Sequence, residues 1–228
     1  MVVCKLIGGL GNQMFQYAYA VELAKELNDD VCFDIESYGE KKPAIFNLHI
    51  THRNTANSIE LSDLAQARKA EKIYHVIQYI IRKLNHEKIG INMFQKLSKR
   101  GYYFNFAPFF YSSIPCGRNN KYVYGYFQGT LYFESINEEI KIEFNSDVSD
   151  AAKKYEIMIK DCNAVAVHIR LGDYCERKNQ YLNVCTDTYY ANGINYIKEN
   201  VENPVFFIFT NGSRLVKRKS YIPERNNC

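Results

Sequence analysis

The sequence contains no tryptophan, only five prolines and no uncharged apolar run near the roughly 18 residues that a membrane span requires. It also lacks an excess of one charge, because 29 basic residues face 25 acidic ones and leave a formal net charge of +4. That balance argues against nucleic acid as a partner. Hydrophobic residues make up 46% of the 228 residues, so we expect a globular protein with a substantial core.

Cysteine forms neither a disulfide framework nor a zinc motif. The seven cysteines are odd in number and contain no CxxC pair. The first residues, Met1–Ile7, lack the basic segment and the long apolar core of a signal peptide, so we expect a cytoplasmic protein with reduced thiols. His49 and His52 have no third ligand at a recognisable spacing, which favours a surface loop over a metal site.

The first 35 residues have the pattern of a βαβ unit. An apolar run, Val2–Ile7, ends at two glycines, and helical spacing of apolar residues follows over Met14–Leu27. A second apolar run, Val31–Ile35, comes next. Two strands joined by a helix imply a parallel sheet, so we predict an α/β fold.

Further elements are expected along the chain, and they group into two blocks. The further predicted strands are Tyr122–Phe127, Ala164–Ile169 and Val205–Phe209. The further predicted helices are Glu71–Leu84, Ser149–Lys160 and Thr186–Val201. Ser37–Ile59 and Gly101–Pro115 are predicted to be irregular. We place domain boundaries at 1–145, 146–210 and 211–228, the last being an unpatterned basic tail. The second block has only two strands, too few for an independent doubly wound domain.

The predicted helix Glu71–Leu84 has the clearest amphipathic pattern in the chain. Its apolar residues recur at intervals of three and four, and they are Ile73, Val76, Ile77, Ile80, Ile81 and Leu84. We interpret this stripe as a face that packs against the sheet. A helix lying on a membrane surface is the alternative.

The first candidate site is the turn Gly8–Gln13, between the first strand and the first helix. Glycine lets a ligand approach the backbone, and amides at a helix start attract phosphate. The amides of Asn12 and Gln13 favour ligand contact over a bare turn. The dinucleotide fingerprint fails because Met14 replaces its third glycine, although Asp34 is placed where a ribose-binding acid would lie.

The second candidate site is His168-Ile169-Arg170-Leu171-Gly172-Asp173-Tyr174, where an apolar strand ends. Strand alternation puts His168 and Arg170 on one face. The planar guanidinium of Arg170 suits a phosphate, and His168 titrates near neutral pH. Alternatively, Arg170 pairs with Asp173 inside the fold and His168 is a core residue.

These residues resemble glycosyltransferase family 11, the α-1,2-fucosyltransferases. Gly8-Gly9-Leu10-Gly11-Asn12-Gln13-Met14-Phe15-Gln16-Tyr17-Ala18 is similar to the family's N-terminal signature, and the segment His168–Tyr174 is similar to its H-x-R-R-x-D-Y donor motif. Gly125-Tyr126-Phe127-Gln128 resembles a third segment between them. The resemblance implies a GT-B-type fold of two Rossmann-like domains, the C-terminal one incomplete here. It also implies GDP-fucose as donor substrate, inversion at the sugar carbon, and no metal or other cofactor.

The resemblance also implies residue roles. Gly9, Gly11, Asn12 and Gln13 would bind the donor, and Arg170 would neutralise the departing diphosphate. His168 and Asp173 are the candidates for the general base that takes the acceptor proton. The acceptor would be a galactose hydroxyl of a surface glycan, which makes peripheral association with the inner face of the membrane an expectation.

Two departures from the family pattern bear on activity. Leu171 replaces the second arginine of the donor motif, which removes one potential donor to the phosphates. After Thr210 the family continues with an acidic pair and a tryptophan-containing segment, whereas this chain has Asn211-Gly212-Ser213 and a basic tail, and it looks truncated or altered there. A catalytically inactive remnant is therefore the alternative function, and an NAD-binding oxidoreductase is a third.

Overall fold

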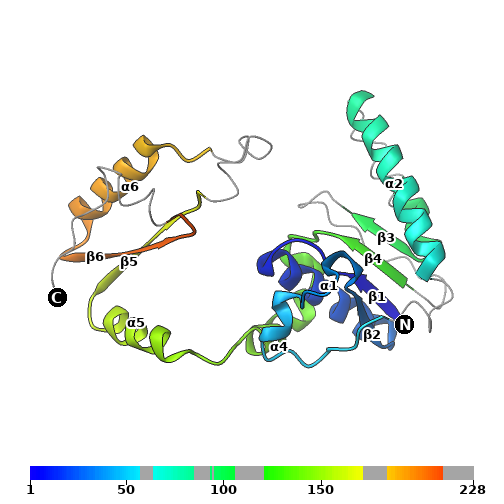
Figure 1. Cartoon of the computed structure of the whole chain (residues 1–228), viewed down its shortest axis with the longest axis horizontal. Helices are drawn as coiled ribbons and strands as arrows, with labels where there is room; N and C mark the ends of the chain where they lie inside the picture. Colours follow the sequence, from blue (N-terminus) through cyan, green and yellow to red (C-terminus); the bar gives the residue numbers. More distant parts are fainter. Residues whose placement is uncertain (57–63, 85–92, 94, 106–120, 172–183, 213–228) are drawn as a thin grey trace. The chain divides into compact units, whose positions relative to one another are not determined.

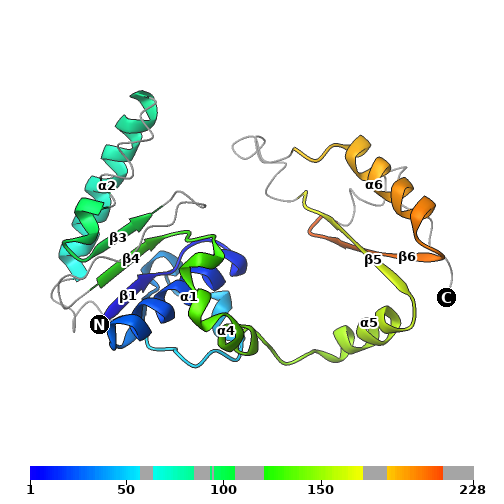
Figure 2. The same cartoon turned by 180° about the vertical axis from the view of Figure 1, so that it is seen from behind.

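The computed structural model describes residues 1–56, 64–84, 93, 95–105, 121–171 and 184–212. The chain divides into two compact units, Met1–Asp147 and Val148–Cys228. Each unit combines parallel strands with helices, which confirms the predicted α/β class (Figures 1 and 2). None of the helices within the described ranges is both long and apolar enough to cross a membrane.

The first unit is built on a four-stranded sheet in which every pair of neighbours is parallel. Its strands, in the order in which they lie side by side, are β2 (Val31–Asp34), β1 (Val2–Lys5), β4 (Lys121–Gly125) and β3 (Tyr102–Asn105). Because all four strands run the same way, the segments that follow β1 and β4 emerge at the same edge. The first and third motifs of the sequence begin at that edge.

One face of this sheet is covered by α1 (Leu10–Leu27) and α4 (Asn137–Glu143), with short 3-10 turns between. The core on this side is rich in aromatic residues, and Tyr19 packs on Phe127 with ring centroids 4.3 Å apart. Each buried aromatic ring removes a large apolar area from water and so contributes strongly to hydrophobic stabilisation. Tyr17, also fully buried, directs its hydroxyl to the Glu143 carboxylate, which ties α1 to α4.

The opposite face is covered by α2 (Leu64–Leu84), and here the predicted packing is wrong. The helix begins seven residues before the predicted start and meets the sheet through Leu64, Ala67 and Tyr74. Ile73 and Val76, from the predicted core stripe, are each 60% exposed. The side of α2 that faces the sheet was not predicted because it contains alanine and ion-paired residues and therefore lacks an apolar stripe.

Two further elements differ from the prediction. Helix α1 starts at Leu10 rather than Met14, so the second half of the glycine motif forms its first turn. Strand β3 lies within Gly101–Pro115, which was predicted to be irregular. Tyr103 and Phe104 of this strand are buried aromatic residues, and the alternation of a short strand was hidden among so many of them.

The second unit contains α5 (Asp150–Lys160), β5 (Asn163–Ile169), α6 (Asp187–Asn200) and β6 (Pro204–Thr210), and β5 pairs with β6 in parallel. The predicted elements are confirmed here. Thr186 caps α6, because its hydroxyl accepts a hydrogen bond from the Tyr189 amide at 3.2 Å, as predicted for an N-cap threonine.

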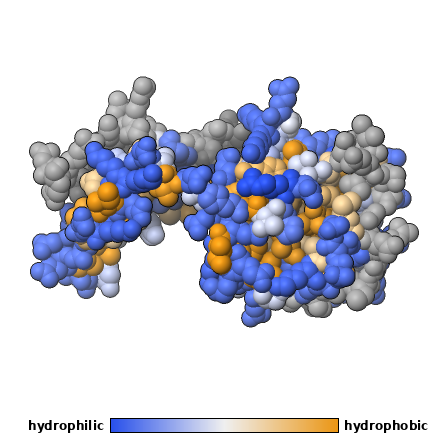
Figure 3. Space-filling view, turned by 90° about the horizontal axis from the view of Figure 1, so that it is seen from below, coloured by the Kyte–Doolittle hydropathy of each residue, from blue (hydrophilic) through white to orange (hydrophobic). Residues whose placement is uncertain are grey.

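The core of the second unit is small. Among the residues described in this unit, only Ile169 and Ile194 are fully buried. Apolar side chains such as Ile157 (63% exposed) and Phe209 (51% exposed) reach the surface, and Figure 3 shows apolar patches among hydrophilic ones on this unit, at the left of the view. Few buried apolar contacts give this unit low local stability.

Candidate active site

The glycine motif forms an open turn at the carboxyl end of β1. Gly8 has a φ of +76°, which only glycine adopts without strain, and a Cβ there would lie 2.5 Å from Asn12 Nδ2. Gly9 is the N-cap of α1 and has no side chain with which to cap it. A Cβ at Gly9 or Gly11 would meet no described atom within 4 Å. The electropositive start of α1 is therefore accessible to an anionic group.

The buried side chain of Gln13 fixes this turn through hydrogen bonds. The side chain is 1% exposed, and its Nε2 donates hydrogen bonds to the Gly8 carbonyl at 2.9 Å and to the Tyr38 hydroxyl at 2.8 Å. Its Oε1 accepts a hydrogen bond from the Ile45 amide at 2.8 Å. Tyr38 also donates to the Gly8 carbonyl, at 2.7 Å, and burial raises the pKa of its hydroxyl. The amide of Gln13 is thus committed to the fold rather than turned outward.

Asn12 connects the first motif with the third. Its Oδ1 accepts a hydrogen bond from Gln128 Nε2 at 2.8 Å, although the two residues are 116 positions apart in the sequence. Gln16, which is fully buried, makes a second connection by donating to the Gly125 carbonyl at 2.9 Å and accepting from the Ile7 amide at 3.0 Å. The first and third segments of the family resemblance therefore meet at one edge of the sheet.

The third segment is shaped by a close approach of two strands. Gly125 ends β4 with a φ of +156°, and a Cβ there would lie 1.7 Å from the Asn105 carbonyl oxygen at the end of β3. Phe127 follows with a φ of +52°, unusual for an aromatic residue, and it is fully buried against Tyr19 and Tyr132. Tight packing of Phe127 fixes the backbone that presents Gln128 to Asn12.

Asp34 does not have the role that the oxidoreductase alternative requires. The carboxylate is 3% exposed and pairs with Arg68 of α2, whose Nη2 lies 3.1 Å from its Oδ1. A small open hollow between α2 and the sheet adjoins this pair. Lys5 and Glu71 also line the hollow and form a second ion pair at 2.6 Å. Its charged side chains thus neutralise one another, which leaves Asp34 unsuited to bind a ribose.

The second motif ends β5, and its alternation is confirmed. Ile169 is buried with 1% exposure, whereas His168 and Arg170 on either side of it are exposed. His168 is consequently not the core histidine that the alternative required. Asp173 lies outside the described residues. Within the described residues, no group of three or more His, Cys, Asp or Glu side chains is placed to hold a metal ion.

Asn211, at the end of β6, is a site residue that sequence reasoning missed. Its Oδ1 accepts a hydrogen bond from the Leu171 amide at 2.9 Å, which fixes the backbone directly after Arg170. The register of the strands explains the contact, because Ile169 lies opposite Thr210. The sequence signal for this contact was an asparagine directly after a strand, where its side-chain oxygen can accept a hydrogen bond from a backbone amide. Tyr38 had no such signal, because its partners Gly8 and Gln13 are distant in the sequence.

Comparison with known proteins agrees with these motifs. The sequence model of Glycosyl transferase family 11 matches residues 1–224 and so continues past residue 210, where the sequence analysis expected the resemblance to stop. An alpha-1,2-colitosyltransferase of Escherichia coli is 29% identical over 221 residues, which are 96% of this chain and 71% of that protein.

A second relative is the O-antigen biosynthesis glycosyltransferase WbnK of Escherichia coli, 26% identical over 90% of this chain and 70% of that protein. No solved structure matches the chain. The family match spans both motifs and the segment between them. The chain therefore belongs to glycosyl transferase family 11.

Proposed function

We propose that the protein is a galactoside 2-α-L-fucosyltransferase, which transfers L-fucose from GDP-fucose to a galactose hydroxyl of a glycan. Membership of the family establishes a glycosyltransferase, and a nucleotide-sugar donor and a glycan acceptor follow from it. The observation that supports the finer proposal is the exposure of both His168, in β5, and Arg170, directly after it. A permanent, exposed cation suits the departure of a diphosphate.

The proposed reaction is a single in-line displacement that inverts the anomeric carbon. The acceptor hydroxyl oxygen forms a bond to the anomeric carbon as the bond from that carbon to the diphosphate oxygen breaks. The electron pair leaves with GDP, and Arg170 neutralises the charge that develops there. The acceptor proton passes to a general base, for which His168 and Asp173 are the candidates.

We assign the glycine motif of the first unit to donor binding. Gly9 and Gly11 would let it approach the start of α1, Asn12 would contact it, and Gln13 would hold the turn through its internal hydrogen bonds. The identity of the donor sugar needs a test of its own, because the name of one relative specifies colitose. Assays with nucleotide-linked fucose and nucleotide-linked colitose, on the same galactoside acceptor, separate the two sugars.

Nucleotide binding is the first test of the proposal. We expect GDP, at about 100 times its dissociation constant, to stabilise the chain by about 2.7 kcal/mol and to raise the thermal midpoint by roughly 5–10 °C. NAD at the same concentration should leave the midpoint unchanged. Differential scanning fluorimetry with an extrinsic dye reads both. A midpoint that neither ligand moves would favour the inactive remnant, and a shift with NAD alone would favour the oxidoreductase.

The substitution Gly11→Ala tests whether the glycine turn meets a ligand. A methyl group at this position enters open space and improves helix propensity, so stability should rise by about 0.5–1 kcal/mol. Transfer should nevertheless fall by at least about tenfold, because the methyl group occupies the donor's approach to the backbone. Urea denaturation and a transfer assay on the same preparation measure the two effects.

Gly193→Ala is the matched control for this substitution. Gly193 also lies in a helix, α6, and a Cβ there also meets no described atom within 4 Å. It should gain similar stability and keep its full transfer rate. Wild-type activity in Gly11→Ala would show that the motif is a tight turn without a ligand.

A further inference from the structure

The outward face of α2 is an apolar stripe that no described part of the chain covers. Ile73 and Val76 are each 60% exposed, Ile80 is 50% exposed and Ile77 is 37% exposed. Their spacing of three and four places them on one side of the helix, opposite the residues that contact the sheet. In Figures 1 and 2 the second half of α2 extends past the edge of the sheet.

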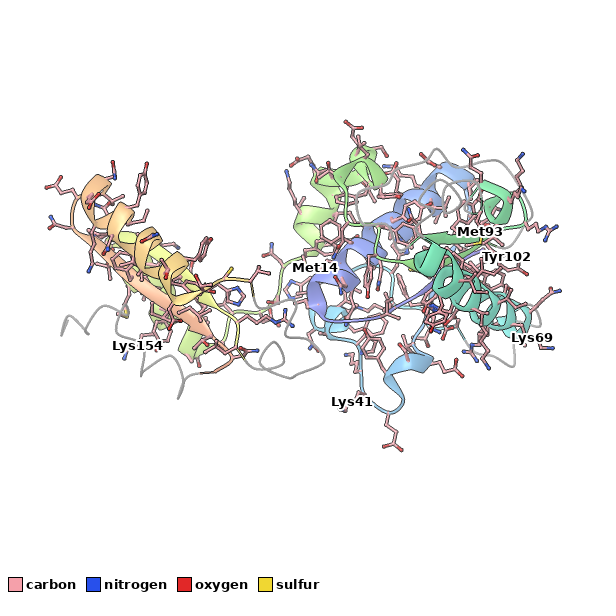
Figure 4. All side chains as sticks on the ribbon, turned by 90° about the horizontal axis from the view of Figure 1, so that it is seen from above. Met14, Lys41, Lys69, Met93, Tyr102 and Lys154 are labelled. Atoms are coloured by element: carbon pink, nitrogen blue, oxygen red, sulfur yellow. The ribbon has the colours of Figure 1, made fainter. Side chains whose placement is uncertain are left out.

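The charges beside this stripe are positive. Lys69 and Lys72 are exposed and have no ion pair within the described part of the chain, and Figure 4 shows Lys69 on the far side of the unit from Met14 of α1. The single acid of α2, Glu71, is paired with Lys5 on the inner side.

We propose that this face of α2 docks the protein on an anionic lipid bilayer, with the helix lying in the plane of the interface. The helix has 21 residues, no acid on its outer side, and an isoleucine-rich stripe next to lysines, which is the composition of helices that bind anionic membrane surfaces. It is not apolar enough to cross the bilayer. The proposal goes beyond the transferase activity and does not depend on which sugar is transferred.

Charge complementarity favours lipid over a second protein surface. An apolar face that joins two protein chains is usually depleted of lysine, whereas lysines near a lipid surface each add attraction to anionic headgroups. Tyr79, 61% exposed, lies beside the stripe, and its ring and hydroxyl suit the boundary between lipid tails and water.

The test uses the full chain and large unilamellar vesicles, either of phosphatidylcholine alone or with 30% phosphatidylglycerol added. Since the chain has no tryptophan, Ile80→Trp places a single tryptophan on the stripe, which can be excited apart from the tyrosines. We expect its emission to shift to the blue and to be quenched by brominated acyl chains with the anionic vesicles, and to respond much less with neutral ones. An emission that stays unchanged with both vesicle types would overturn the proposal.

Two double variants then measure, in a vesicle sedimentation assay, how much the apolar residues and the lysines each contribute to binding. Val76→Gln/Ile80→Gln should weaken binding to anionic vesicles by at least about tenfold, and Lys69→Gln/Lys72→Gln by roughly tenfold or more. Ile157→Gln, an equally exposed isoleucine on α5, is the control and should bind like the wild type. Equal binding by all variants would overturn the assignment of this face.

Transfer to a short soluble acceptor separates this proposal from the proposed function. It should proceed at the wild-type rate in Val76→Gln/Ile80→Gln, because those residues lie outside the candidate site. A second copy of the chain is the other partner that such a face could bind, and light scattering measures this self-association. A concentration-dependent dimer that the same double variant dissociates, with no vesicle binding by the wild type, would assign α2 to self-association instead.

Discussion

Replacement of Arg170 by alanine should reduce sugar transfer by roughly 10²–10³-fold and leave the fold intact, because a fixed cation is lost from the departing diphosphate. The side chain is exposed at the end of β5, so its removal opens no cavity. The measurement is the steady-state transfer rate, with far-ultraviolet circular dichroism and the thermal midpoint as checks on folding. A nearly normal rate in this variant would remove Arg170 from the mechanism.

Two further variants make the result specific. Arg170→Lys keeps the charge but loses the planar fork that can hold two oxygens, so its rate should lie between those of wild type and alanine. Arg100→Ala removes an exposed arginine that belongs to neither motif and lies just before β3 in the other unit, and it should have no effect on the rate. Equal losses in Arg100→Ala and Arg170→Ala would point to net charge rather than to a site.

Replacement of Gly125 by alanine should destabilise the first unit by at least about 4 kcal/mol, enough to prevent folding at moderate temperature. The added Cβ would lie 1.7 Å from the Asn105 carbonyl oxygen, and both atoms belong to the backbone or are fixed to it. The strands β3 and β4 would have to separate where they pair, with Asn105 opposite Gly125. Urea denaturation followed by circular dichroism, or the yield of soluble protein, measures the loss.

Gly129→Ala is the appropriate comparison, because Gly129 lies only four residues further on. A Cβ there would meet Tyr132 at 3.7 Å, an ordinary contact, and its backbone is extended. Its stability should stay within about 0.5 kcal/mol of wild type. Comparable stability in the two variants would mean that the approach of Gly125 to Asn105 is not as tight as described.

Local patterns were sufficient to predict much of the fold. The apolar runs that became β1, β2, β5 and β6 are short and bounded by breakers, and the hydroxyl that caps α6 is visible in the sequence. The alternation that puts His168 and Arg170 on one face needs only the period of a strand. These features depend on neighbouring residues, which is why the sequence alone reveals them.

Features that depend on distant partners were not predictable in this way. The inner side of α2 contacts the sheet partly through Arg68 and Glu71, and only the positions of Asp34 and Lys5 in space make those charges suitable there. Because these charged residues lie on the inner side of α2, Ile73 lies on its outer side. Gln13 is a similar case, because its burial and its bond to Ile45 become visible only when the loop after β2 is in place.

The interior position of β1 has a consequence for how the chain folds as it is synthesised. Val2 pairs on one side with Val31 but on the other with Lys121, more than a hundred residues later. At a ribosomal rate of roughly 5–20 residues per second, the second neighbour emerges several seconds or more after β1 itself. During that interval the β1–β2 pair has one open, apolar edge, so nascent chains of intermediate length should be the form that chaperones bind and that aggregates most readily.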